Sequence, residues 1–600
     1  MVAGLNGHSW FGLVVYIVVM GLVIKGLSIP IPKVISLQLR RLLVWMRLLD
    51  PYPPLASNAS SPSLATETFN STTAALSHDE SGAKVESQQV TPSQAQPAIV
   101  AQRDPRWKIV LDLRTAPVTG VILLLMTTTI DRSVLRLGIV GDDSVKPYDV
   151  LVLFFSLAYI STALDSTGGL RSLAFWISQK TAKAPKKAGG EKVASGFTMF
   201  TVLYSFWFGS GLFVGNDPIV LSGTAFLGYF TRVTGIANPT AWIFSQFQAA
   251  NIASAALVSS NPTNVLIAGA FHLNFLTGFT ANTIFPTVVT AVAGFALLVM
   301  VFVKILPRAK DSMSTKAGQQ YIPKYLHPPD VNPRSALLDP KGALFHSGLM
   351  AVTLGLLVGT SFLHVEVWMI TMPAGVIAFV RDLASEVWKQ PDHQDEMEMV
   401  VPRAKQAQIT PRRQSLPAFV AAFKNRFPTT SRTIAHLPFS LVLFAGGIFV
   451  LSRALTTLGW TAIFAGWLAK ICINPPAAIF FLGYFVAFVM CPLLGTNIGA
   501  TILAVEILRD PRFVNSPHVV ADPRILHGAI FSTAMATNIG AFSWTLSSSL
   551  AGLLWVTILK QRGITVTNKD FARWNMLFLP ALSTLSSAAV LLQTYCFPLS

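Results

Sequence analysis

Four short polar interruptions break the long apolar runs of this 600-residue chain, and they hold the side chains best suited to bind an ion. They are Gly209–Pro218 and Ser259–Asn264 in the first half, and Gly495–Gly499 and Leu546–Ser549 in the second. Broken backbone at membrane depth is tolerated only where it is buried in protein or lines a cavity. Hydroxyl, amide and carboxyl groups beside half-helix ends would form a small polar cage for an ion or a small polar solute.

Eleven residues in these interruptions form the candidate site. Asp217 ranks first, because a carboxylate in the middle of a membrane helix costs about 2.5–3.5 kcal/mol and persists where it faces an ion or proton pathway. Its alternative role is to cap the helix that starts at Pro218. The other candidates, each of which could instead cap a half-helix, are Asn216, Ser260, Asn261, Thr263, Asn264, Thr496, Asn497, Ser547, Ser548 and Ser549.

Two further asparagines have two possible roles each, and the sequence contains no catalytic motif. Asn251 and Asn538 could line the site or form hydrogen bonds between helices. The sequence holds no glycine-rich phosphate loop, paired carboxylate site, metal-ligand cluster or nucleophile elbow. We therefore expect that the protein is not an enzyme and binds no cofactor or metal. We expect any transport to be driven by a gradient, with H⁺ or Na⁺ as the coupling ion.

The composition places these interruptions in a membrane. The chain is 52% hydrophobic and 12% charged, with mean hydropathy +0.54, whereas a soluble protein is about 25% charged. Apolar runs of spanning length recur along it, so we predict an all-α polytopic membrane protein of the plasma membrane or an internal membrane, with the lipid bilayer as its partner. The net charge of +17 lies in loops, which indicates topology signals and no nucleic acid.

The apolar and polar stretches predict seven regions. The linker carries two glycosylation sequons, at Asn58 and Asn70, and their use would place it outside and reverse every side assignment. The regions are a first transmembrane helix plus a basic interfacial helix (1–50), a disordered Ser/Thr-rich linker (51–107), a first transporter repeat (108–306), a cytoplasmic loop (307–344), a transmembrane pair (345–380), a long cytoplasmic loop (381–434) and a second repeat (435–600).

The two predicted repeats match each other in sequence. Placing the Lys- and Arg-rich segments inside makes the two blocks enter the membrane from opposite sides, as inverted repeats do. In each half, one break should be the tip of a re-entrant hairpin and the other the unwound middle of a span, and charge does not decide which. The matched segments are Leu151-Val-Leu-Phe with Leu441-Val-Leu-Phe, Ala163–Gly168 with Ala454–Gly459, Gly215–Pro218 with Thr496–Gly499, and Asn251–Ala253 with Asn538–Gly540.

The order of these motifs resembles the ion transporter superfamily, in particular its citrate-transporter-like and arsenite-permease-like members. The resemblance covers about Ala116–Thr594 apart from the long loops. It implies inverted repeats with a scaffold and a mobile transport domain that moves as an elevator, and a homodimer. It also implies hairpin tips at Asn216-Asp217 and Thr496-Asn497, with broken spans at Ser260–Asn264 and Ser547–Ser549.

The resemblance is less specific about the substrate. Dicarboxylate carriers of the superfamily have Ser-Asn-Thr at each tip, where this chain has Gly215-Asn216-Asp217 and Thr496-Asn497-Ile498. The Asn-Asp pair is closer to the arsenite-permease branch, where an acid serves proton exchange. We therefore expect a secondary transporter of a small anion or oxyanion, first an arsenite-type efflux system. The alternatives are a citrate-like anion transporter, a Na⁺/H⁺ antiporter, or a non-transporting receptor or scaffold on the same fold.

Overall fold

The computed structural model describes residues 5–30, 32, 108–141, 146–181, 193–306, 320–327, 331–360, 365, 368–388, 416–437 and 439–596. The chain divides into two compact units, residues 1–28, 110–400 and 423–600, and residues 29–109 and 401–422. Few residues of the second unit are described, and the cavities lie in the first. The predicted linker 51–107, its sequons at Asn58 and Asn70, and nearly all of the predicted basic helix at Pro30–Leu49 lie outside the described residues.

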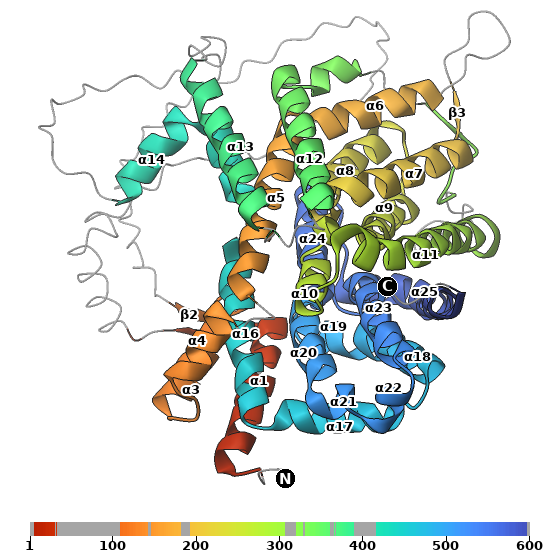
Figure 1. The fold of residues 1–600 in the computed structure, drawn as a ribbon. Helices are drawn as coiled ribbons and strands as arrows, with labels where there is room; N and C mark the ends of the chain where they lie inside the picture. The colour runs from red at the N-terminus through yellow and green to blue at the C-terminus, as the bar shows by residue number, and fades with distance from the viewer. Residues whose placement is uncertain are drawn as a thin grey trace, which may run out of the picture. The chain divides into compact units, whose positions relative to one another are not determined.

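The first half of the chain is a series of helices with a few short strands (Figure 1). In order, the elements are α1 (Gly7–Lys25), β1 (Leu27–Pro30), β2 (Lys108–Leu111), α3 (Ala116–Met126), α4 (Arg132–Val140), α5 (Pro147–Ser166), α6 (Gly169–Thr181), β3 (Ala194–Ser195), α7 (Gly196–Val214), α8 (Asn216–Val233), α9 (Thr240–Ala253), η1 (Val258–Ser260), α10 (Pro262–Ala270), η2 (Phe275–Thr280), α11 (Ala281–Val299) and η3 (Met300–Ile305).

A middle segment then leads into a second series. The middle segment contains β4 (Tyr325–Leu326), η4 (Pro333–Ala336), α12 (Pro340–Thr360), α13 (Trp368–Trp388), α14 (Leu416–Arg426) and α15 (Pro428–His436). The second series contains α16 (Phe439–Thr457), α17 (Trp460–Ile471), α18 (Pro475–Phe485), η6 (Val486–Met490), α19 (Cys491–Leu493), α20 (Asn497–Arg509), α21 (Pro511–Val514), α22 (Pro517–Ala521), α23 (Arg524–Ile539), η7 (Gly540–Phe542), η8 (Leu546–Ser548), α24 (Leu550–Gln561) and α25 (Asn568–Cys596).

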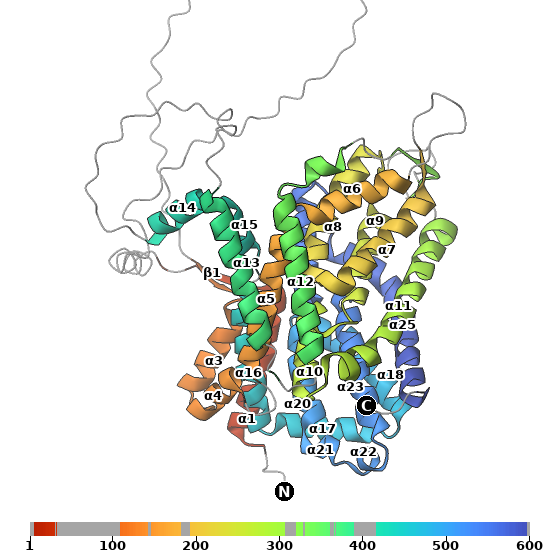
Figure 2. The same ribbon diagram turned by 45° about the horizontal axis from the view of Figure 1, so that its top comes forward.

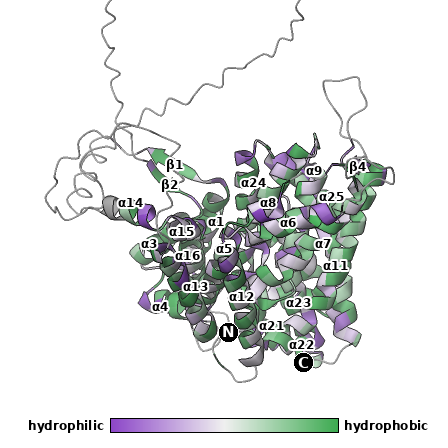
Figure 3. Ribbon diagram, turned by 90° about the horizontal axis from the view of Figure 1, so that it is seen from above, coloured by the Kyte–Doolittle hydropathy of each residue, from purple (hydrophilic) through white to green (hydrophobic). Residues whose placement is uncertain are grey.

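The structure is that of a polytopic helical membrane protein. Within the described residues, seven helical segments are long and apolar enough to cross a membrane, or eight if the bent pair α16 and α17 counts as one. Long stretches of the helices are hydrophobic (Figure 3), and large apolar side chains such as Ile17, Val292 and Leu592 are more than half exposed. An apolar outer surface of this kind suits contact with lipid.

Two stretches predicted as continuous apolar runs are broken in the structure. The run Tyr148–Ile177 divides into α5 and α6, and the run Leu437–Ala469 divides into α16 and α17, which meet at 77°. The breaks fall at Gly168 and Gly459, whose φ values of +78° and +88° are ones that side chains other than glycine rarely adopt. These glycines end the matched segments Ala163–Gly168 and Ala454–Gly459, so the motif marks a sharp turn.

The predicted loop 381–434 contains more helix than expected. α13 continues to Trp388, and α14 and α15 follow before the second series begins. One reason is that the buried Glu386 carboxylate accepts hydrogen bonds from the first backbone N–H groups of α15, at Thr429 and Thr430. A negative charge at a helix N-terminus stabilises the helix, and here it comes from a different element, which local sequence patterns do not reveal.

The two series pack on each other reciprocally. α7 packs on α9 as α18 packs on α23, and α11 packs on α9 as α25 packs on α23. Between the series, α10 packs on α20 while α24 packs on α8. The short helices α10 and α24, which follow the breaks at Asn261 and Ser549, therefore each lie against the opposite series.

The break between α7 and α8 depends on Gly215. Its backbone has φ +90° and ψ 168°, a region that is essentially limited to glycine, and a Cβ there would lie 2.9 Å from the Ser260 carbonyl oxygen. We predict that Gly215→Ala lowers the free energy of unfolding by about 1–3 kcal/mol. Thermal unfolding of the purified protein in detergent checks this. Gly209→Ala is the matched control on α7, because a Cβ there meets nothing within 4 Å, and a loss of the same size in both variants would contradict the prediction.

Candidate functional site

Four helix N-termini meet at a small cavity near the centre of the helical unit. The cavity has a volume of about 10 Å³, room for about one water molecule. Two of the helices begin at the predicted tips and two begin after the predicted broken spans. Its lining consists of Asn216 and Asp217 of α8, Asn261 and Pro262 of α10, Asn497 and Ile498 of α20, and Ser549, Leu550 and Ala551 of α24.

The backbone at this cavity is rich in free hydrogen-bond donors. The first N–H groups of any α-helix have no partner within the helix. Here the capping side chains Thr496 and Ser549 bond the third N–H of α20 and α24, which leaves the first two free, and α8 has no side-chain cap. Six backbone N–H groups on the cavity make no hydrogen bond within the part of the chain that the structure describes: those of Asn216, Asp217, Asn497, Ile498, Leu550 and Ala551.

This arrangement favours an anion. Backbone N–H groups and the positive ends of helix dipoles together form a ready-made anion site. The side-chain amide of Asn497 also makes no hydrogen bond with the described residues, although the residue is only 3% exposed. Asp217 opposes anion binding, because its negative carboxylate would repel a bound anion unless a proton or a cation neutralises it.

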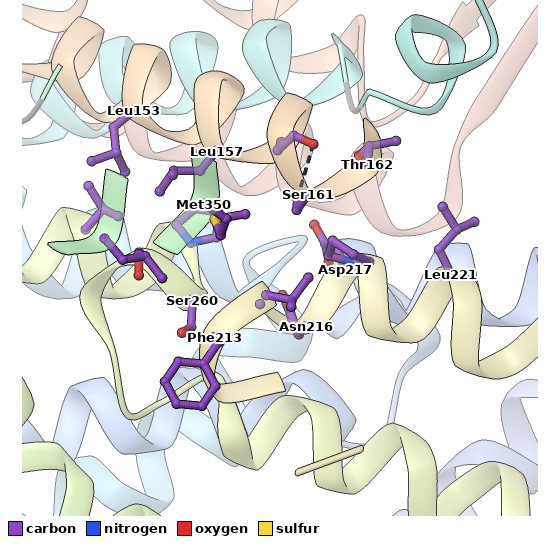
Figure 4. A pocket seen from close by; sticks show the side chains of 18 of the residues that line it. Leu153, Leu157, Ser161, Thr162, Phe213, Asn216, Asp217, Leu221, Ser260 and Met350 are labelled. Atoms are coloured by element: carbon purple, nitrogen blue, oxygen red, sulfur yellow. Dashed lines mark hydrogen bonds between the residues drawn. The ribbon is translucent and has the colours of Figure 1, made fainter. Parts of the chain in front are cut away.

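A larger cavity adjoins the small one. It has a volume of about 80 Å³ and shares Asn216, Asp217 and Pro262 with the small cavity. Figure 4 shows Asp217 at the start of α8 directed toward Ser161 of α5, with Ser260 and Phe213 on the other side of the cavity. Among apolar residues, its lining also includes the polar side chains of Ser161, Thr162, Ser259, Ser260 and His436.

Buried asparagines hold the broken segments in place. Asn538 of α23 accepts hydrogen bonds from Ser254 Oγ at 2.9 Å and from Asn261 Nδ2 at 2.8 Å, and it donates to Asn264 Oδ1 at 2.8 Å. Asn251 of α9 accepts a bond from Asn216 Nδ2 at 3.1 Å. All six residues are at most 5% exposed. Asn251 and Asn538 therefore act as interhelical hydrogen-bonding residues, and neither lines the two cavities.

The structure divides the eleven predicted site residues into two groups. Asn216 and Asp217 line both cavities, Ser260 lines the larger one, and Asn261, Asn497 and Ser549 line the smaller one. The remaining five lie behind this surface and line neither cavity. They are Thr263, Asn264, Thr496, Ser547 and Ser548, and four of them make hydrogen bonds that cap or brace the breaks, namely Asn264, Thr496, Ser547 and Ser548.

The sequence did not predict the positions of three residues that lie at or near the cavities. His436, the last residue of α15, lines the larger cavity although it lies beyond a predicted loop. Nothing in the apolar run around Ser254 marks this residue as part of a site. Asp165 is 8% exposed and lies beside Ser222. No sequence pattern reveals these positions, because each depends on contacts between distant helices.

Within the described residues, no three His, Cys, Asp or Glu side chains lie close enough together to hold a metal ion. Among the described residues, Asp217 is the one carboxylate that lines either cavity. The site therefore combines backbone N–H groups, amides, hydroxyls, the His436 imidazole and this single carboxylate, which suits binding of a polar solute.

Asn538 should be essential for the shape of the site. In Asn538→Ala, Asn261 Nδ2 and Asn264 Oδ1 lose buried partners, and each unsatisfied group costs about 1–3 kcal/mol. We expect a clear drop in the thermal unfolding midpoint. Thr537→Val is the neighbouring control, because Thr537 Oγ1 bonds only the Ala534 carbonyl of its own helix. Equal midpoints for Asn538→Ala and Thr537→Val would show that the asparagine is not a structural bridge.

The sequence was compared with models of known protein families. The model described as citrate transporter matches residues 101–523, which include α8, α10 and α20 and end before α24. The match covers well over half of the chain and agrees with the resemblance to the ion transporter superfamily. The chain therefore belongs to the citrate transporter family, whose members are secondary transporters of citrate-like anions.

Proposed function

We propose that this protein carries a citrate-like organic anion across the membrane by alternating access, and that the anion binds where the small and the larger cavity adjoin. The observation that carries the proposal is the convergence of six unpaired backbone N–H groups from α8, α20 and α24 on one cavity. Several carboxylates of one substrate could each bind a different helix N-terminus. A single inorganic ion would leave most of these donors unused.

Asp217 is proposed to carry the coupling ion. An ionised Asp217 beside a polyanion is unfavourable, so the substrate and a proton or a cation should bind together. A cation would be shared by the carboxylate and the substrate, and a proton would make Asp217 a hydrogen-bond donor. Either way, release of the coupling ion restores the negative charge and expels the anion, which links the two movements.

The family match favours the citrate-like alternative over arsenite-type efflux, which the Asn216-Asp217 pair had suggested first. The free donors favour it as well, because arsenite is largely uncharged near neutral pH. Sodium/proton antiport does not account for the N–H groups. A non-transporting receptor or scaffold has no need for unpaired donors in both series, so we place it last.

We further propose that the two series are inverted repeats and that part of the protein moves as an elevator. The reciprocal contacts of α10 with α20 and of α24 with α8 support the repeats. The same proposal makes Asn216-Asp217 and Thr496-Asn497 hairpin tips, and it makes η1 and η8 the breaks of two spans. We propose a homodimer by family analogy alone.

The backbone donors can be tested one at a time. Leu550 is the first residue of α24, a position where proline is tolerated because its N–H is not needed by the helix. The extended Ser549 (φ −151°, ψ 156°) suits a following proline, and α10 already begins with Pro262. We predict that Leu550→Pro folds but raises the KM for citrate about tenfold, since one bond to a charged group is worth about 1.5–3 kcal/mol.

The matched control is Leu550→Ala, which shortens the same side chain but keeps the N–H group. Uptake of labelled citrate into liposomes measures both variants. If the two variants have the same KM, the backbone donor at this position does not bind the substrate, and the proposed site is wrong.

The role of Asp217 is tested with the purified protein in liposomes that contain a pH-sensitive dye. Citrate, arsenite, sulfate and sodium are added in turn. We predict a citrate-dependent pH change that Asp217→Asn abolishes, because an amide cannot take up a proton. Asp522→Asn, in the connection between α22 and α23, should behave as wild type. Citrate uptake without a pH change would assign a cation to Asp217, and no citrate uptake by folded protein would overturn the proposed function.

A further inference from the structure

An apolar groove lies away from the two cavities, between α17, the segment from α18 to α19, and α20. It has a volume of about 480 Å³, about three times that of an apolar cavity that binds one benzene molecule. All fifteen described side chains that line it are apolar, and none of them lines the two cavities of the candidate site. The groove therefore suits a hydrocarbon chain, because a polar ligand would lose its hydrogen bonds to water there without replacement.

The groove runs along a segment that spans the membrane. The helical stretch Pro475–Leu493, made of α18, η6 and α19, is long and apolar enough to cross a membrane. Phe481, Phe485, Val489 and Leu493 recur along it every four residues and all line the groove, so they form one stripe about 18 Å long. Spanning helices tilt by about 20° from the bilayer normal on average. The groove therefore follows the direction in which lipid acyl chains also run.

The groove is open toward lipid. Phe485, Val489 and Leu493 are exposed, whereas Leu482 and Met490 beside them are buried and form its floor. Apolar side chains exposed on a spanning segment face the hydrocarbon of the bilayer. An acyl chain can therefore enter the groove sideways from the membrane.

α17 closes one end of the groove at the depth of the lipid headgroups. It meets α16 at 77°, and its 12 residues extend only about 18 Å, so it lies near the membrane plane and does not span. Trp467 and Ile471 line the groove, and Lys470 beside them is exposed. Tryptophan and lysine at a helix end are typical of the membrane–water interface. Figure 2 shows α17 and α21 together at one end of the helical unit, and the two helices pack on each other.

The charges beside this end of the groove are mainly positive. Lys470 ends α17, Arg509 ends α20, and Arg512 lies on α21. The acid between the two arginines is Asp510, which accepts a hydrogen bond from the backbone N–H of Arg512 at 2.9 Å. Glu506 is held by groups of α16 instead. Three basic residues beside one acid suit the phosphate group of a phospholipid.

We propose that the groove binds one acyl chain of a membrane phospholipid, with the phosphate group of that lipid beside Lys470. The chain packs between α17 and α20 and fills the space along α18. Because α20 begins at Asn497 on the small cavity and passes the groove at Ala504 and Leu508, the lipid supports a helix that carries part of the candidate site. The lipid site does not depend on which substrate the protein carries.

The first test locates the acyl chain on the full-length protein. The protein is placed in phosphatidylcholine nanodiscs with a little phosphatidylglycerol that has a photoactivatable group in one acyl chain, and labelled peptides are identified by mass spectrometry. We expect labelling at the groove to be several-fold above that at exposed apolar residues elsewhere, such as Val292 of α11. Val489→Trp fills the groove from its exposed side and should remove this excess, whereas Val292→Trp should keep it.

Two results of this experiment would overturn the proposal. One is labelling spread evenly over the apolar surface, which would mean that the groove holds lipid no better than any other part of that surface. The other is a groove that stays unlabelled, as it would if a second copy of the chain covered it.

The second test measures the contribution of the phosphate group. Purified protein in detergent is titrated with phosphatidylglycerol or with diacylglycerol of the same chains, and binding is followed as a rise in the thermal unfolding midpoint. Lys470→Gln should weaken the binding of phosphatidylglycerol about fivefold and leave that of diacylglycerol unchanged. Lys560→Gln, an exposed control at the end of α24, should behave as wild type.

Equal affinity of the wild-type protein for the two lipids would contradict the proposal, and so would unchanged binding of phosphatidylglycerol by Lys470→Gln. Neither test measures citrate uptake, so a failure here is distinct from a failure of the proposed function.

Discussion

The structure depends on one constraint: a helix that stops inside an apolar environment leaves backbone groups that must find partners. The chain meets this constraint with side chains at most of its breaks. Asn261, Thr496 and Ser549 cap the helices that follow them, and Asn538 ties one broken segment to the other series. Six of the donors that remain unpaired line one cavity, so the same constraint that makes the breaks costly also concentrates hydrogen-bond donors there.

Much of this could be predicted from the sequence, because glycine, proline and asparagine mark breaks locally. The interruptions at Gly209–Pro218, Ser259–Asn264, Gly495–Gly499 and Leu546–Ser549 are the places where the helices stop. Asn216 and Asn497 were predicted as site residues, and both lie on the small cavity. The glycines that end α5 and α16 were also in matched segments, but apolar composition alone could not tell a turn from a continuous span.

The rest could not be predicted, because it depends on partners far apart in the chain. Asn538 bonds Asn261 across 277 positions, and Glu386 stabilises the start of α15 from a different helix. His436 reaches the larger cavity only because α15 is held in this way. The distinction between side chains that face the cavity, such as Ser549, and neighbours that brace it, such as Ser548, also depends on a local backbone path that residue types do not determine.

α10 and α24 each pack against the opposite series, and this has a consequence for biosynthesis. α8 is complete 328 residues before its partner α24, and α10 is complete 239 residues before its partner α20. Until then, the first half inserts into the membrane with open breaks and with asparagines that lack their final partners. We expect the early half to need temporary partners, such as water, lipid headgroups or the insertion machinery. A truncated first half should not mature by itself, because neither half contains a complete binding site.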